Sequence, residues 1–424
     1  MTIATGSPLT LDARASRAWA RRFARTTPGV VVVIAVAVAA SCILAGVVSA
    51  AAVGSRIAEQ KAVLDRSEPF AYAAQNLYAA ASAADAAAAT SFLYGGLQTP
   101  LMRARYQQSL AAATSALADA TAGAPDADTR KALAEVSAQL TTYAGLVEAA
   151  RANGVQGFPI GSSYLREASS LMQTELLPSA EKVYAADLAR VDHSQRRIGS
   201  LPKVSLALLA LAVVAIAAGS ATMSKRTNRQ FNVGLVAAGV VTVLVSACIV
   251  GAVHLAAGEV ERGRTEGTEK FGRIAEARIL AQQARTDETL QLISRGDITA
   301  SEKKFDGHID DLRTRLGTSS PAATDAVNKW VAGHRKQVDA YRAGDFPAAV
   351  VQALGTDPGG SGAQFAIVES TLGDALQQAR TTMRDYMSDA GDYLVWIPTA
   401  TLVLMTAAAA AAVIGLWPRL KEFL

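Results

Sequence analysis

The stretch from Val30 to Val53, which reads VVVVIAVAVAASCILAGVVSAAAV, decides the fold. It contains no Asp, Glu, Lys or Arg, and a helix needs roughly 20 apolar residues to cross a bilayer. Arg21 and Arg22 precede it, as basic residues precede a secretion signal, but the apolar run is about twice the 7–15 residues of a signal core. We therefore expect an uncleaved transmembrane anchor.

Three more stretches of this kind follow, at residues 204–222, 233–257 and 394–416. The chain is 50% hydrophobic but only 6% aromatic and 18% charged, whereas soluble proteins carry about 25% charged residues. Alanine supplies most of the apolar excess and favours helix. We predict an all-α protein with four transmembrane helices, and we expect Pro398 to kink the fourth.

Positive charge flanks the spans on one side of the membrane. The segment 1–29 has five arginines against one aspartate, the turn 223–232 has three basic residues, and residues 417–424 carry Arg419 and Lys421 against Glu422. Because basic residues mark cytoplasmic segments, we expect a multi-pass plasma-membrane protein with both termini in the cytoplasm. Residues 54–203 and 258–393 are then extracytoplasmic.

The three cytoplasmic pieces are 29, 10 and 8 residues long, too short for a catalytic domain of ordinary size. We therefore expect no enzyme activity in this chain. No cofactor is expected, since the four histidines have no His or Cys partner at helical spacing and Cys42 and Cys248 lie within apolar runs. The bilayer is an expected partner and nucleic acid is not.

The two large regions share one plan, in which a span leads into a long region and a second span returns. Glycine and proline breaks divide residues 54–203 into four helical stretches, at about 55–93, 101–121, 126–152 and 162–200. Breaks at 294–297, 317–321 and 355–362 divide the second region, and residues 344–354 are expected to add a short helix. We predict two tandem extracytoplasmic antiparallel four-helix bundles, related by internal duplication and similar to chemoreceptor sensors.

The first helix of the first region has a seam of small and apolar residues spaced alternately four and three apart, which is typical of helix packing. The seam comprises Phe70, Ala74, Leu77, Ala81, Ala84, Ala88 and Ser91.

Candidate contacts for a ligand or partner lie beside these breaks. Asp85 sits in an alanine run, where a carboxylate is costly unless paired, and it could hold a ligand amine, Arg103 or Arg105. Arg285, Asp287 and Glu288 occupy the corresponding place in the second region. The alternative for both groups is a charge on a solvated helix flank.

Candidate cytoplasmic contacts for a protein partner are, apart from one proline, basic or aromatic: Arg21, Arg22, Lys225, Arg226, Arg229, Trp417, Pro418, Arg419 and Phe423. The basic residues among them could instead meet anionic lipid, at about 1 kcal/mol each.

Several strings along the chain resemble the GlnX family of actinobacterial tetraspan membrane proteins. They are RTTPG at 25–29, AADAAAAT at 83–90, GLVEAARAN at 145–153, GSSYLREAS at 161–169, AQQARTDETL at 281–290 and GLWPRL at 415–420. The resemblance implies a relay of amino-acid availability, glutamate or aspartate, from a GlnH-like solute-binding lipoprotein to a cytoplasmic Ser/Thr kinase similar to protein kinase G. It carries no residue-level motif for the partner contacts.

Two other functions fit the same architecture. The bundles could bind a small ligand directly, or the chain could be a structural membrane scaffold that does not switch. Binding of an amino acid by the purified protein would favour the first of these. Identical helix packing with and without an effector would favour the second.

Overall fold

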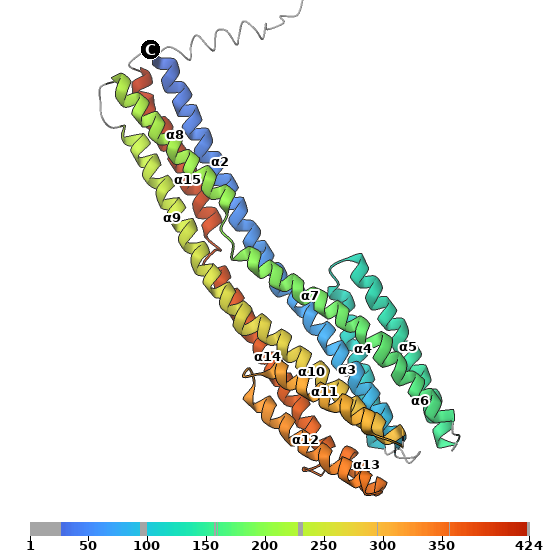
Figure 1. Ribbon diagram of the computed structural model, residues 1–424. Coiled ribbons are helices and arrows are strands. Elements are labelled where there is room, and N and C mark those ends of the chain that lie inside the picture. The colour runs from blue at the N-terminus through green and yellow to red at the C-terminus, as the bar shows by residue number, and fades with distance from the viewer. Residues whose placement is uncertain are drawn as a thin grey trace, which may run out of the picture. The chain divides into compact units, whose positions relative to one another are not determined.

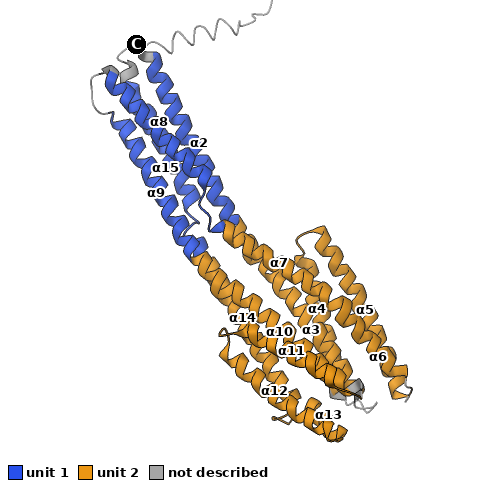
Figure 2. Ribbon diagram, in the orientation of Figure 1, with its two compact units in different colours: residues 1–58, 198–258, 389–424 blue, residues 59–197, 259–388 orange. Residues whose placement is uncertain are grey.

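The computed structural model describes residues 27–93, 100–156, 158, 160–227, 232–294, 296–355 and 357–421, and over these residues the chain is helical with no strand (Figure 1). The predicted all-α class is confirmed. The chain forms two compact units (Figure 2).

Unit 1 comprises residues 1–58, 198–258 and 389–424. Its helices are α2 (Thr27–Ala62), α8 (Lys203–Thr227), α9 (Val233–Arg262) and α15 (Ile397–Lys421). Each contributes an apolar run long enough to cross a membrane, so the prediction of four candidate spans is confirmed. Large apolar side chains such as Val36, Val204 and Ile414 are more than half exposed, which is the surface that a bilayer covers.

Small residues let helices of unit 1 approach closely. A Cβ atom on Gly234 of α9 would lie 2.3 Å from the carbonyl oxygen of Ala411 and 2.6 Å from Cα of Gly415, both in α15. The Asn232 amide donates a 2.9 Å hydrogen bond to the Gly415 carbonyl oxygen at the same crossing. Close backbone contact of this kind is a common basis of helix association in lipid.

The expected kink at Pro398 is wrong. Helix α14 ends at Asp392 and α15 begins at Ile397, so Pro398 is the second residue of a new helix. N–H groups in the first turn of a helix make no hydrogen bond within the helix, so the missing N–H of proline costs nothing there. Proline therefore starts this helix instead of bending it.

Unit 2 comprises residues 59–197 and 259–388. Its first half contains α3 (Glu68–Leu93), α4 (Pro100–Gly123), α5 (Ala127–Val155), α6 (Ile160–Leu171) and α7 (Leu177–Ile198). Its second half contains α10 (Glu269–Ser294), α11 (Thr299–Leu316), α12 (Pro321–Arg342), α13 (Phe346–Leu354) and α14 (Ser361–Asp392). The helical stretches expected from the breaks are confirmed to within a few residues. Asp126, Ser320 and Asp345 cap α5, α12 and α13 through their side-chain oxygens.

All seven seam residues from Phe70 to Ser91 are buried. Helix α3 packs along α4 and also against α10 of the second half. One apolar core consequently includes Leu77 and Tyr143 from the first half and Phe305 and Trp330 from the second. The two halves are joined by this core into a single unit.

Within the described part of unit 2, three π-helices interrupt the helices: η1 (Val63–Ser67), η2 (Met172–Leu176) and η3 (Gly263–Thr268). Two of them, η1 and η3, directly follow the helices that carry the first and third spans. Pro69 and Pro178 follow η1 and η2 closely, and a proline cannot donate to the helical ladder. Insertions of this type often occur at functional positions in helices.

Candidate functional site

A buried carboxylate, Asp85, lies in the first half of unit 2. Helix α3 carries it into the core, where it is 2% exposed. It accepts hydrogen bonds from the Tyr143 hydroxyl at 3.3 Å, the Ser169 hydroxyl at 2.9 Å and the Gln173 amide at 3.1 Å. These donors come from α5, α6 and η2. Burial raises the pKa of Asp85 above its ordinary value, and the three hydrogen bonds oppose this only in part.

The arginines considered as partners of Asp85 lie elsewhere. Arg103 and Arg105 are both exposed on α4, and the described partners of Asp85 are all neutral. The three donors favour the ionised carboxylate, but no countercharge among its described partners offsets the burial that raises its pKa.

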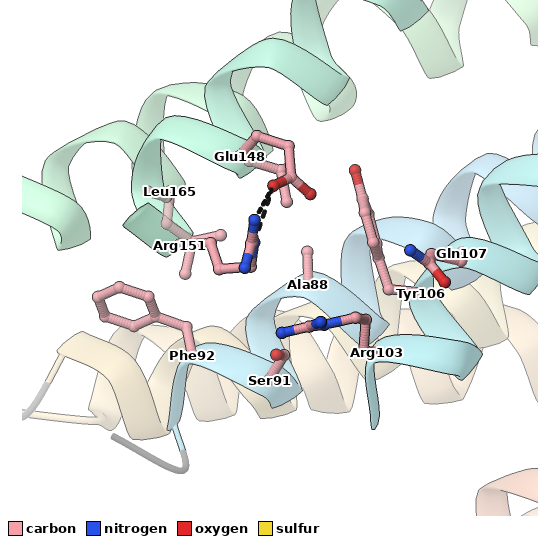
Figure 3. Close-up of a pocket in the computed structure, with 11 residues that line it drawn as sticks. Ala88, Ser91, Phe92, Arg103, Tyr106, Gln107, Glu148, Arg151 and Leu165 are labelled. Carbon is pink, nitrogen blue, oxygen red and sulfur yellow. Dashed lines mark hydrogen bonds and ion pairs between the residues drawn. The ribbon is translucent and has the colours of Figure 1, made fainter. Parts of the chain in front are cut away.

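A cavity of about 180 Å³ lies among α3, α4, α5 and α6 in this half, and its polar residues come mainly from α4 and α5 (Figure 3). Arg151 ion-pairs with Glu148 at 2.6 Å. Tyr106 is 7% exposed, and its hydroxyl has no hydrogen-bond partner among the described residues. Arg103 also lines this cavity. The apolar part of the wall comes from Ala88, Phe92, Val147, Ala150 and Leu165.

The second half of unit 2 buries a different carboxylate, Glu288, which is 0% exposed. Arg285 donates to it at 2.5 Å, His334 Nδ1 lies 2.9 Å from it, and Trp330 Nε1 donates to it at 3.3 Å. The Ser361 hydroxyl also donates to it. Arg285 further donates to the Ala353 carbonyl oxygen at 2.8 Å. This cluster ties α10 to α12, α13 and α14.

Charged partners dominate the electrostatics of this second cluster. Burial alone would raise the pKa of Glu288, but Arg285 and His334 bring it down to about 2. Burial alone would lower the pKa of His334, yet its bonds to Glu288 and Glu302 raise it to about 9. Phe305 stacks on the His334 ring at 3.7 Å between centroids. We call Glu288, Arg285 and His334 the ionic anchor, because the buried carboxylate contacts both of its positively charged partners.

Asp287, the neighbour of Glu288, faces a different place. Its carboxylate lies 3.0 Å from His308 Nδ1, in an open cleft of about 610 Å³ between the two halves. Ser169 and Gln173, which hold Asp85, line the same cleft. Asp287 thus lines this cleft, whereas Asp85 is buried and only its partners Ser169 and Gln173 line it; Glu288 is not among the lining residues.

Of the candidate cytoplasmic residues, Lys225, Trp417 and Pro418 are exposed. The side chains of the others lie outside the described residues: Arg21, Arg22, Arg226, Arg229, Arg419 and Phe423.

Sequence reasoning missed most of the partners in these clusters. These partners lie far in sequence from the carboxylates they contact: Tyr143, Ser169, Gln173, Trp330, His334 and Ser361. The sequence did contain one indication of the second cluster: Trp330 and His334 are four residues apart and therefore lie on the same face of a helix.

The fold and these clusters define an all-helical, multi-pass membrane protein whose second unit has buried polar centres. Residues 59–196 match the family model described as an actinobacterial sensor domain. The match coincides with the first segment of unit 2, residues 59–197, and it indicates a sensing role for that segment. No curated protein and no solved structure matches the chain.

Proposed function

We propose that this protein is a non-enzymatic transmembrane signal transducer. In this proposal a GlnH-like solute-binding lipoprotein, loaded with glutamate or aspartate, docks on unit 2 outside the cell. The change in helix packing is read in the cytoplasm by a Ser/Thr kinase similar to protein kinase G.

The observation that carries the proposal is the sensor-domain match over residues 59–196 in a chain with four candidate spans. The strings that resemble the GlnX family, among them residues 83–90 and 281–290, support the identity of the partners. The cytoplasmic pieces that the charge pattern predicts are short, so a separate output enzyme is required.

Helix continuity offers a route for the signal. Helix α2 runs from Thr27 to Ala62 and α9 from Val233 to Arg262, so each holds a span and also contributes residues to unit 2. A binding event needs a differential affinity of only about 1–3 kcal/mol for two packings to bias such a helix.

The test is co-purification of the tagged full chain from membranes in mild detergent, with and without added glutamate or aspartate, followed by mass spectrometry. We expect a solute-binding lipoprotein and a kinase, in amounts that respond to the amino acid. Trp417→Ala should reduce recovery of the kinase but not of the lipoprotein. Trp396→Ala is the matched control, since the two tryptophans are 57% and 58% exposed and flank the same span. Recovery of neither partner, or of both regardless of amino acid, would rule out the relay.

Orientation is tested separately by cysteine labelling in a variant that lacks Cys42 and Cys248. Thr142, exposed on α5, and Lys225, exposed at the end of α8, supply the two positions. Thr142→Cys should react with an impermeant maleimide in intact cells, and Lys225→Cys only after permeabilisation. The reverse pattern would invert the proposed topology.

A further inference from the structure

The cavity lined by Arg103, Tyr106 and Arg151 contains polar groups that have no partner among the described residues. It encloses about 180 Å³, which is below the roughly 300–1,000 Å³ of pockets for drug-sized ligands. Such a space suits a molecule of a few heavy atoms. Its walls combine aliphatic and aromatic side chains with two guanidinium groups.

The charge of the cavity is positive. Arg151 is neutralised by Glu148, to which it donates at 2.8 Å through Nε. Arg103 has no carboxylate partner among the described residues. Figure 3 shows its guanidinium extending from α4 toward the side of the cavity where Arg151 lies. One uncompensated positive charge therefore remains in the cavity.

The Tyr106 hydroxyl provides a second, independent observation. It is buried without a partner among the described residues, whereas the large majority of buried polar atoms are hydrogen-bonded. Burial, with the nearby Glu148 and Asp85 charges, raises the pKa of Tyr106 to about 12. The hydroxyl therefore keeps its proton at neutral pH and can donate it to an acceptor.

We propose that this cavity binds a small carboxylate of net charge −1, held by Arg103 and by the Tyr106 hydroxyl. Guanidinium groups match carboxylates in geometry and can donate two parallel hydrogen bonds. The short carbon chain of the ligand lies against Phe92, Val147 and Leu165. This inference rests on the cavity alone and not on the proposed lipoprotein or kinase.

The test uses the purified full chain in detergent, without partner proteins. Thermal shift and calorimetry are run with acetate, propionate, L-lactate and L-aspartate, each of net charge −1 at neutral pH, and with propionamide as the uncharged control. We expect at least one carboxylate to bind with one-to-one stoichiometry and propionamide not to bind. Arg103→Gln should weaken binding about tenfold or more, because a hydrogen bond to a charged group is lost. Tyr106→Phe should weaken it by a smaller factor.

Arg105→Gln is the matched control, since Arg105 is exposed on the same helix and does not line the cavity. It should leave affinity unchanged. Because Arg103 is itself exposed, Arg103→Gln should unfold at the wild-type temperature when no ligand is present. Absence of carboxylate binding, equal binding of propionamide, or unchanged affinity in both Arg103→Gln and Tyr106→Phe would overturn the proposal.

Discussion

The guanidinium of Arg384 donates a 2.9 Å hydrogen bond to the backbone carbonyl oxygen of Leu64. The carbonyl oxygen of Leu64 would normally accept a hydrogen bond from the N–H four or five residues later. In η1 the N–H of Glu68 instead donates to the Val63 carbonyl oxygen, and Pro69 has no N–H. Arg384 replaces these donors, and it also ion-pairs with Glu68 at 2.6 Å. A residue of the second half thus stabilises the π-helix of the first.

Arg384→Met should therefore lower the free energy of unfolding by about 1–3 kcal/mol, because a partly buried carbonyl and a buried carboxylate lose a donor. The measurement is thermal or chemical unfolding of the full chain in detergent. Arg335→Met is the control, as Arg335 is exposed on α12. Equal stability of the two variants would show that the π-helix does not need this contact.

Asp85→Asn tests the buried carboxyl group of the first half. Since burial raises the pKa of Asp85 from 3.8, the folded state holds this proton more tightly than the unfolded state. The associated stability is present below that ordinary value and is lost as the pH rises through the raised pKa. The unfolding temperature of the wild type should therefore fall more steeply than that of Asp85→Asn as the pH rises above about 4.

Other carboxyl groups, such as Asp187 with a pKa raised to about 7 by burial, titrate in both proteins and cancel in this comparison. Asp85→Leu should instead be less stable than Asp85→Asn by about 1–3 kcal/mol, because it leaves Tyr143, Ser169 and Gln173 without their acceptor. Parallel pH profiles for wild type and Asp85→Asn would contradict a raised pKa of Asp85.

His334→Gln tests the ionic anchor of the second half, whose stabilisation is also lost as the pH rises. The partners of His334 raise its pKa from 6.5 to about 9, so its stabilisation is present below 6.5 and is lost as the pH rises through 9. Over that interval the wild type should lose more stability than His334→Gln, by an amount on the order of 3 kcal/mol. His193→Gln is the control, since His193 is exposed on α7, and it should keep the wild-type profile.

Gly234→Ala tests the close crossing of α9 and α15 in unit 1. The new methyl group would meet the Ala411 carbonyl oxygen and the Gly415 backbone, so we expect a loss of about 1–3 kcal/mol in detergent unfolding. Gly251→Ala is the matched control on the same helix, because nothing lies within 4 Å of its Cβ position. If both variants are equally stable, the crossing is looser than the structure indicates.

The spans and the helix breaks could be predicted from the sequence because each depends on local pattern. An apolar run of span length has few alternatives to a membrane helix, and the spacing from Phe70 to Ser91 already placed seven side chains on one buried face. The short helix α13 was also visible between two glycine breaks.

The polar clusters could not be predicted, because their members meet only in the fold. Asp85 shows its isolation in an alanine run, but nothing in that run points to Tyr143, 58 residues further along the chain. The π-helices differ from α-helices by a single inserted residue. Proline follows η1 and η2, whereas η3 has no such mark, so no simple sequence rule covers all three.

The core shared by α3 and α10 joins two halves within one polypeptide. A symmetric dimer of identical chains must repeat every substitution on both sides of its axis. Here the two halves differ, because one buries an acid among neutral donors while the other buries an acid in an ionic network. The molecule therefore has two unlike sides, and a partner that recognises one of them would bind with a single copy per chain.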